Sequence, residues 1–498
     1  MNLRNRPGWT IAACVLGGAV HAQQTTFEVT ITDLPLLPGG TYASAYAIND
    51  TGKIVGMAND ASGAFRTVEW VNGQIAVMPD LSANGGLCVP EDLNDAGESA
   101  GRQSISGFFS YAIHWDAQNN VSALPGLAGG SSALNTAHAI NASGQIVGGA
   151  QQGGPNYWGH AVVWFQGALQ ADLGFLGGGT YSEAYGLNDL GDVVGVAALA
   201  NTNQHAFLWQ NGQYTDLSTW SGGGASSKAY AINNHGDIVG LNANVASIWR
   251  NGAVQALPMP QGLSAFTPAI DINDAGHIIA TASAGYPLEV GVLWRDGTPI
   301  DLGTLPGGTI SRARRINAAG EVVGEARSQS GFFHAVKWTV TARPTPFCFG
   351  DGTGNACPCG NVGAAGNGCA HSISASGANL SGSGSASLAN DTLVLSGTGM
   401  PNSSALYFQG TTQQNGGLGS AFGDGLRCAG GTVIRLGTKT NASGSSHYPA
   451  LGDLTISVQG LVATPGTRPY QVWYRNSASF CTASTFNLSN GVLVAWGV

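Results

Sequence analysis

Charged residues are scarce in this chain: Asp, Glu, Lys and Arg together make up only 9% of its 498 residues. The 19 basic residues are outnumbered by 28 acidic ones, and they form no cluster of the kind that displaces counterions from phosphates. The same balance argues against binding to anionic membrane surfaces. We therefore expect neither a nucleic acid nor an anionic lipid surface as a partner.

Long apolar runs are also missing, since no segment approaches the roughly 20 apolar residues of a membrane helix. One shorter run, from Trp9 to Val20, follows two arginines and ends near Ala22 in a small-residue pattern. This arrangement is typical of a secretory signal, so we predict a signal peptide over residues 1–22 and a secreted protein. An alternative lipoprotein signal would lipidate Cys14 and attach the protein to the cell surface, although the apolar run before Cys14 is short.

Glycine, by contrast, is abundant, with 76 residues, and much of it belongs to an internal repeat. Residues 48–56 read Ile-Asn-Asp-Thr-Gly-Lys-Ile-Val-Gly, and related strings return every 40 to 47 residues. The central glycines of the seven copies are Gly52, Gly97, Gly144, Gly191, Gly236, Gly276 and Gly320. A period of this length is typical of β-propeller blades.

Each copy predicts four strands. Asn-x-x-Gly between two apolar runs favours a tight turn, because Asn bonds its own backbone and Gly adopts a positive φ at little cost. Later in each copy comes a tryptophan, and in four copies Asn-Gly or Asp-Gly then marks a two-residue hairpin. Residues 27–34 match a fourth strand, whereas residues 333–339 match a third strand with no fourth strand after it. We therefore predict an all-β, seven-bladed propeller over residues 25–341, whose last blade is closed by the N-terminal strand.

Three copies carry His-Ala before the tryptophan, at His160, His205 and His334. Together with the Leu-x-Gly-Gly and Ile-Asn-x-x-Gly-x-Val-Val-Gly elements, these strings resemble the HAF-type extracellular repeat family over about residues 27–340. The resemblance implies secretion and a repeat fold, and it transfers no catalytic residue. The histidines lie too far apart along the predicted outer strands to share a metal ion, so we expect a structural role for them.

Beyond a linker at residues 342–347, the chain changes character. Residues 348–498 hold six cysteines, which in an exported chain indicate three disulfides with 15 alternative pairings; the six are Cys348, Cys357, Cys359, Cys369, Cys428 and Cys481. The alternative is a zinc site that uses the first four of these cysteines. Alternating apolar runs predict a disulfide-linked β-sandwich, and the block resembles a Cys-rich C-terminal module common in secreted bacterial proteins. Two Gly-Asp-Gly strings, at residues 350–352 and 423–425, read as turns rather than calcium loops.

The variable connections between blades gather on one face of the predicted propeller, and we expect ligand binding there. Aromatic residues in these connections suit stacking on sugar rings. With one cation from an inner strand, the predicted ligand-binding residues are Tyr157, Trp158, Trp220, Phe109, Tyr286, Phe333 and Arg314.

Charged residues of the innermost strands are the only catalytic candidates. If the protein is an enzyme, the candidates are Glu91, Asp92, His138 and Asp271, through acid–base chemistry on glycosidic bonds. A structural alternative pairs Asp271 with Arg315 of the neighbouring blade. The chain has no nucleophile elbow, phosphate-binding loop or His-Glu-x-x-His string.

Taken as a whole, the sequence predicts a monomeric, secreted, non-catalytic binding or adhesion protein that recognises a carbohydrate or a surface polymer. It predicts no cofactor and no metal ion. Two alternatives remain open at this point: an extracellular polysaccharide hydrolase or lyase, and a purely structural surface protein.

Overall fold

The computed structural model describes residues 27–81, 86–104, 110–127, 135–151, 159–200, 203–260, 262–263, 267–285, 288–388, 391–478 and 480–497. Residues 29–340 form one compact unit, the propeller, and residues 341–498 lie in a second, the C-terminal unit. The predicted signal peptide and Cys14 lie outside the described residues. Among the described residues, no helix is both long and apolar enough to cross a membrane.

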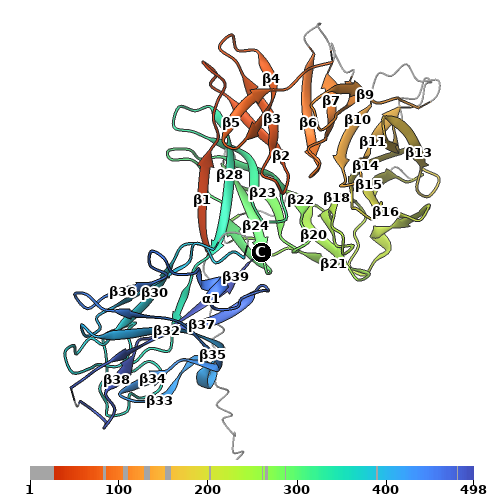
Figure 1. Ribbon diagram of the computed structural model, residues 1–498. Helices are drawn as coiled ribbons and strands as arrows, with labels where there is room; N and C mark the ends of the chain where they lie inside the picture. The colour runs from red at the N-terminus through yellow and green to blue at the C-terminus, as the bar shows by residue number, and fades with distance from the viewer. Residues whose placement is uncertain are drawn as a thin grey trace, which may run out of the picture. The chain divides into compact units, whose positions relative to one another are not determined.

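The propeller contains seven antiparallel four-stranded sheets, arranged as the blades of a ring (Figure 1). The first three blades are β2 (Ala43–Ile48), β3 (Ile54–Asn59), β4 (Phe65–Val71) and β5 (Gln74–Val77); β6 (Leu87–Leu93), β7 (Ser99–Ser104), β8 (Ser110–Trp115) and β9 (Val121–Ala123); and β10 (Thr136–Ile140), β11 (Gln145–Gln151), β12 (Gly159–Phe165) and β13 (Ala168–Gly174). In each of them the chain passes from the innermost strand to the outermost, as the repeat predicts.

Blades 4 to 6 repeat this order, with a single 3-10 turn, η1 (Leu217–Thr219), after the fourth blade. They are β14 (Tyr181–Leu187), β15 (Val193–Ala198), β16 (Gln204–Gln210) and β17 (Gln213–Asp216); β18 (Ser227–Ile232), β19 (Ile238–Asn242), β20 (Val245–Arg250) and β21 (Ala253–Ala256); and β22 (Ala269–Ile272), β23 (Ile278–Gly285), β24 (Leu288–Arg295) and β25 (Thr298–Asp301).

Blade 7 is built from both ends of the repeat region. It contains β26 (Ser311–Ile316), β27 (Val322–Arg327) and β28 (Phe333–Ala342), and its outer strand is β1 (Phe27–Asp33), in the order β1-β28-β27-β26. The predicted closure of the last blade by the N-terminal strand is therefore confirmed. β28 is therefore covered by β1 where the ring closes, instead of being left as an edge strand.

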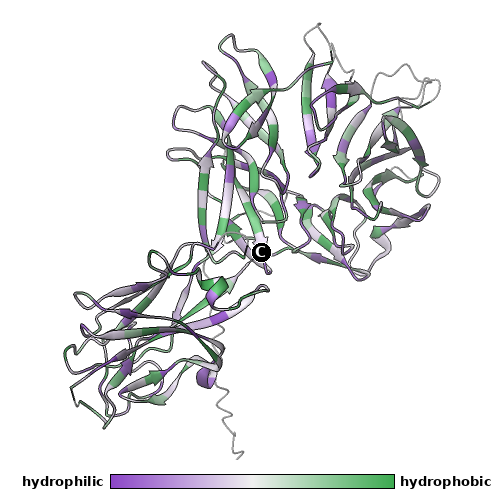
Figure 2. Ribbon diagram, viewed as in Figure 1, coloured by the Kyte–Doolittle hydropathy of each residue, from purple (hydrophilic) through white to green (hydrophobic). Residues whose placement is uncertain are grey.

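Apolar side chains pack between neighbouring blades, and apolar residues recur along the strands (Figure 2). One core cluster joins Val323 and Ala335 of blade 7 to Ala43 and Trp70 of blade 1. The indole N–H of Trp70 donates to the Pro35 carbonyl oxygen at 2.8 Å, and Trp115 and Trp164 make the same kind of bond to Pro79 and Pro125. The repeated tryptophans thus tie each of these blades to the connection that precedes it.

The His-Ala histidines have a structural role in this arrangement. The Nδ1 atom of each lies within 3.1 Å of an aspartate oxygen on the neighbouring outer strand; the pairs are His160–Asp172, His205–Asp216 and His334–Asp33. In blade 7 this contact joins β28 to β1, so it crosses the closure of the ring.

The C-terminal unit packs one sheet against another. A larger sheet contains β29 (Thr345–Phe347), β39 (Gly491–Trp496), β37 (Gly466–Arg475), β32 (Ser404–Gln413) and β35 (Ala429–Thr440) in that order, with β38 (Phe486–Leu488) paired to β37. The smaller sheet contains β30 (Asn379–Ser383), β31 (Val394–Thr398) and β36 (Ser446–Tyr448). Leu380 and Leu395 of the smaller sheet share one buried core with Tyr407, Tyr470 and Val472 of the larger sheet, which is the predicted sandwich.

The remaining elements of this unit are the hairpin β33 (Ser420–Phe422) and β34 (Gly425–Arg427), the 3-10 turn η2 (Gln414–Gly417) and the short helix α1 (Ile456–Gln459). All six cysteines form disulfides, which join Cys348 to Cys428, Cys357 to Cys369 and Cys359 to Cys481. The zinc alternative is therefore wrong, since the sulfur atoms that it needs are bonded to one another. Three disulfides are typical of proteins that fold in an oxidising compartment.

Candidate functional site

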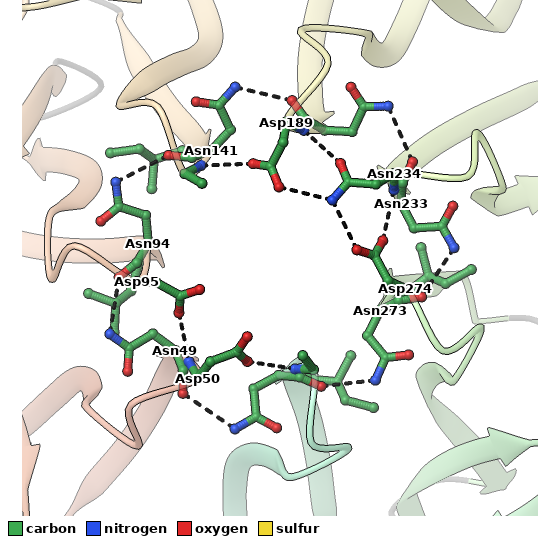
Figure 3. A pocket seen from close by; sticks show the side chains of 18 of the residues that line it. Asn49, Asp50, Asn94, Asp95, Asn141, Asp189, Asn233, Asn234, Asn273 and Asp274 are labelled. Carbon is green, nitrogen blue, oxygen red and sulfur yellow. Dashed lines mark hydrogen bonds between the residues drawn. The ribbon is translucent and has the colours of Figure 1, made fainter. Parts of the chain in front are cut away.

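One end of the propeller axis, which we call the turn end, is closed by a ring of asparagines. The seven repeat asparagines are Asn49, Asn94, Asn141, Asn188, Asn233, Asn273 and Asn317, and all are buried. Asn49, Asn94, Asn141, Asn233 and Asn273 are labelled in Figure 3. Each donates its side-chain amide to the backbone carbonyl oxygen of the equivalent asparagine in the next blade, at 2.9 to 3.3 Å. The last of these bonds runs from Asn317 back to Asn49, so the ring is complete.

The same side chains also fix the turns between the first and second strands. Each asparagine Oδ1 accepts the N–H of the residue four positions later, at 2.9 Å. One amide group therefore holds a turn in its own blade and the backbone of the next. The sequence predicts the first of these roles but not the second, because the partner in the second belongs to another blade, 40 or more residues away along the chain.

A shallow pocket of about 230 Å³ opens at the turn end, inside the asparagine ring. Four aspartates border it, Asp50, Asp95, Asp189 and Asp274 (Figure 3). Each accepts a backbone N–H of a neighbouring blade, as Asp50 does from Ala318 at 2.7 Å. These carboxylates add contacts at four of the seven junctions between blades, and we assign no ligand to them.

The opposite end of the axis, which we call the bulge end, is lined by a different position of the repeat. In every innermost strand the register shifts by one residue, three positions before the repeat asparagine. A β-bulge of this kind re-aims one side chain. The seven bulged residues are Tyr46, Glu91, His138, Tyr185, Tyr230, Ile270 and Arg314, and together they line a pocket of about 420 Å³.

A glycine on the second strand makes room for the bulge. A Cβ atom at Gly240, for example, would lie 2.0 Å from the carbonyl oxygen of Lys228 in the facing strand. The equivalent glycines of five further blades are equally confined, with 1.9 to 2.2 Å to the corresponding oxygen; they are Gly56, Gly101, Gly148, Gly195 and Gly324. Blade 6 has Ala280 instead, and there the first strand begins only at Ala269, after the residue that would supply this carbonyl group.

Blades 3 to 5 contribute an aromatic arc to the pocket. The rings of Tyr185 and Tyr230 are stacked with centroids 5.2 Å apart, and His138 meets Tyr185 edge to face at 5.2 Å. The Nε2 atom of His138 lies 2.9 Å from Glu183, which also accepts the hydroxyl groups of Tyr181 and Tyr185. Burial alone would raise the pKa of Glu183, but these hydrogen bonds outweigh it and lower the pKa to about 2.

Blade 7 contributes three arginines from β26. Arg312 bonds Glu289 and lies 2.9 Å from Glu325, whereas Arg314 lies 3.6 Å from Glu325. The guanidinium group of Arg314 stacks over the ring of Tyr46, 4.3 Å from its centroid. Three cations from one strand are therefore among the residues that line the pocket.

Arg315, next to the bulged Arg314, reaches from blade 7 to two other blades. Its guanidinium group reaches Asp92 of blade 2 at 3.3 Å and the His138 carbonyl oxygen of blade 3 at 3.4 Å. Asp271 accepts the N–H of Ile316 at 2.9 Å, and burial raises its pKa to about 6 despite the nearby Arg315. Burial likewise raises the pKa of Asp92. The ion pair expected between Asp271 and Arg315 is thus replaced by one that spans the ring to Asp92.

The structure brings part of the predicted site together. The pocket at the bulge end is lined by three of the predicted residues, Glu91, His138 and Arg314. The ring of Phe333 lies under Arg312, another lining residue, with 5.0 Å between the ring centroid and the guanidinium carbon. Asp92 and Asp271 lie one layer deeper, engaged by Arg315 and backbone N–H groups. Trp220 packs against the core cluster around Leu217 and Trp249 instead. Phe109, Tyr157, Trp158 and Tyr286 lie outside the described residues.

Sequence reasoning missed Tyr46, Tyr185, Tyr230 and Glu183. A signal for the three tyrosines exists, since they stand three positions before the repeat asparagine, beside the position at which the charged residues Asp92, Asp271 and Arg315 drew attention. In six of the seven blades the second strand carries a glycine at the same position, and this was a further sign that the backbone of the facing first strand is irregular. No comparable signal exists for Glu183, because its role comes from the contact with His138 of another blade.

No protein-family model matches the chain, and no curated protein matches it, so the resemblance to the HAF-type family stays a prediction. Among solved structures, a mutant of AofleA from Arthrobotrys oligospora is similar at a TM-score of 0.30 and 13% identity, over 57% of this chain and 92% of that one. The fucose-recognising, six-bladed propeller lectin of Aleuria aurantia is similar at 0.30 and 9%, over 61% and 95%. A puromycin-hydrolysing peptidase of Mycobacterium tuberculosis is similar at 0.41 and 9%, over 63% and 56%.

Proposed function

We propose that this chain is a secreted carbohydrate-binding protein and that a sugar occupies the pocket at the bulge end of the propeller. The observation that carries the proposal is the convergence of seven side chains on one pocket of about 420 Å³, one from each blade and of five residue types. Ligand pockets of proteins typically measure 300 to 1,000 Å³ and combine apolar walls with a few placed polar groups.

The lining suits a sugar for two reasons. The stacked Tyr185 and Tyr230 rings and the nearby His138 offer an aromatic wall against which the C–H face of a sugar ring can pack. Glu91 supplies an acceptor and Arg314 supplies donors for hydroxyl groups. The predicted loop aromatics, Phe109, Tyr157, Trp158 and Tyr286, together with Phe333 at the rim, remain candidates for contacts with a longer polymer.

A pull-down of the purified protein on a panel of insoluble polysaccharides tests this proposal. The wild type is expected to be retained on at least one polymer, and the Tyr185→Ala and Tyr230→Ala variants are expected to be retained less. Leu190→Ala is the matched control, because Leu190 is exposed at the turn end, away from the pocket. Retention that is equal in all four proteins would overturn the assignment of the pocket, and no retention on any polymer would overturn carbohydrate binding.

One observation favours the enzymatic alternative. Glu183 orients His138 at the wall of the pocket, and a carboxylate that orients an imidazole is the arrangement used by general bases. Asp92 and Asp271, which the sequence suggests for glycosidic chemistry, accept backbone N–H groups instead. Release of oligosaccharides into the pull-down supernatant by the wild type, and its loss in His138→Gln, would establish catalysis.

A further inference from the structure

The three arginines of β26 differ in how their N–H groups are used. Arg312 bonds Glu289 and Glu325, and Arg315 bonds Asp92 together with two backbone carbonyl oxygens. The side chain of Arg314 donates no hydrogen bond within the part of the chain that the structure describes. Its nearest carboxylate, Glu325, lies at 3.6 Å, and its Nε atom is buried without an acceptor.

An unused guanidinium donor inside a pocket is costly unless a ligand meets it. A buried N–H group without an acceptor costs about 1 to 3 kcal/mol, and five donors of a guanidinium group lie in one plane. The side chain of Arg314 is 33% exposed and lines the pocket, so ligand atoms can reach its terminal Nη groups, whereas its Nε atom stays buried. Glu325 is only 2% exposed and is already shared with Arg312 and Tyr42, so it cannot turn fully toward Arg314.

The position of Arg314 is also fixed in advance. Its guanidinium group lies over the Tyr46 ring at 4.3 Å, an arrangement that cation–π attraction stabilises. Stacking occupies one face of the group and leaves the in-plane N–H donors of its two Nη groups available. A planar fork of this kind matches a carboxylate, which accepts two parallel hydrogen bonds.

We infer that the pocket at the bulge end takes an anionic sugar, a uronic acid unit, whose carboxylate binds Arg314. The inference rests on the proposed function and names its ligand class. Around the ring, Tyr46 of blade 1 lies between Arg314 of blade 7 and Glu91 of blade 2. Glu91 pairs with Arg102 at 3.4 Å. A carboxylate is therefore attracted at blade 7 and repelled at blade 2, which gives the sugar one orientation, with its ring toward Tyr185 and Tyr230.

Isothermal titration with matched oligosaccharides tests the inference on the full chain. The pairs are glucuronic acid against glucose and galacturonic acid against galactose, with the linkage held constant. In at least one pair the acidic sugar is expected to bind roughly tenfold tighter or more, as one charge-assisted bidentate pair allows. Arg314→Gln is expected to abolish this preference, and Arg314→Lys is expected to keep only part of it, because lysine retains the charge without the fork.

Arg66→Gln is the control, since it removes one propeller cation that pairs with Asp60 on the outer part of blade 1. It is expected to leave the preference unchanged. Equal binding of acidic and neutral sugars, with loss of both in Tyr230→Ala, would overturn the inference and leave the proposed function standing. Binding of sulfated but not carboxylated sugars would overturn the carboxylate assignment, and binding of no sugar would overturn the proposed function itself.

Discussion

The two ends of the propeller axis are built from positions only three residues apart in the repeat, yet they differ completely in composition. At the turn end all seven blades carry asparagine, whereas at the bulge end the seven blades carry tyrosine, glutamate, histidine, isoleucine or arginine. The asparagine amide bonds backbone atoms of two blades, so every blade needs the same group. The bulged side chain points into an open pocket, and only the backbone around it must stay the same.

This difference separates what the repeat needs for folding from what it leaves free. A position whose side chain bonds the neighbouring blade requires the same residue type in every blade, because the neighbouring blade presents the same backbone carbonyl group each time. A position that faces the axis meets six other side chains and the space between them. Variation inside a conserved frame is what a binding site requires, and the propeller provides it at one end of its axis.

The largest expected effect comes from closing the space opposite a bulge. Gly240→Ala would place a Cβ atom 2.0 Å from the Lys228 carbonyl oxygen, so the bulge in β18 must shift or flatten. We expect a loss of about 3 kcal/mol in the free energy of unfolding, together with weakened sugar binding, because Tyr230 is the residue that this bulge presents. Chemical denaturation followed by tryptophan fluorescence measures the first effect, and titration measures the second.

The matched control is Ala280→Gly in blade 6, where the same strand position already holds alanine. This change removes a methyl group and creates no steric clash. The free energy of unfolding is expected to fall by less than about 1 kcal/mol, because glycine gives the unfolded chain more backbone freedom. A Gly240→Ala protein that is as stable as the wild type would contradict the link between this glycine and the bulge.

The second prediction compares the two ends within blade 5. Asn233→Ala removes the bond to the Asn273 carbonyl oxygen at 3.1 Å and leaves the N–H groups of His235 and Asp237 without their acceptor. We expect a loss of about 2 kcal/mol in the free energy of unfolding, because the buried Asn273 carbonyl oxygen loses its donor and two part-buried N–H groups lose their acceptor. Tyr230→Phe, three residues earlier, is expected to change stability by less than about 0.5 kcal/mol.

Denaturation midpoints of both variants, measured side by side, test this contrast. Equal losses would show that the bulge end is as important for folding as the turn end, and the distinction drawn between them would fail. A Tyr230→Phe protein with unchanged stability but altered sugar affinity would instead sharpen it.

The repeat itself was sufficient to predict the blades, their four strands and the closure by β1, because those features depend on local turn chemistry and on the period. The predicted site was found only in part. Glu91, His138 and Arg314 were identified as charges near the axis, but the tyrosines beside them were not, since a β-bulge alters which residue faces inward and simple alternation does not predict it. The pairing of Arg315 with Asp92 across the ring depends on closure in three dimensions.

The cysteines illustrate the same limit in the C-terminal unit. Their number and the predicted export indicated three disulfides, whereas the choice among 15 pairings required the fold. Cys359 and Cys481 stand 122 residues apart, and both lie close in sequence to residues that bond Asp424: Asn361 donates to its carbonyl oxygen and Thr482 to its carboxylate. Composition determines whether cysteines pair, and topology determines which ones do.

The smallest expected effect lies between the two ends, at Asp271, and depends on pH. The folded protein holds the pKa of Asp271 at about 6, above its ordinary value of 3.8, because burial disfavours the charged form. The folded state therefore binds this proton more tightly than the unfolded state does. The resulting stabilisation is complete below about pH 4 and is lost as the pH rises through 6. Lowering the pH from 7 to 5 is expected to add about 1 kcal/mol through this group.

Asp271→Asn removes this titration. The free energy of unfolding of the wild type, minus that of the variant, should therefore rise by about 1 kcal/mol as the pH falls from 7 to 5. The lost hydrogen bond to Ile272 or Ile316 adds a constant offset that does not change with pH. His277 acts in the opposite direction, since burial lowers its pKa to about 4, but it is present in both proteins and cancels from the difference. Parallel stability curves over this range would show that Asp271 is fully ionised in the folded propeller, and the layer around Arg315 would then be a balanced charge cluster rather than a protonated one.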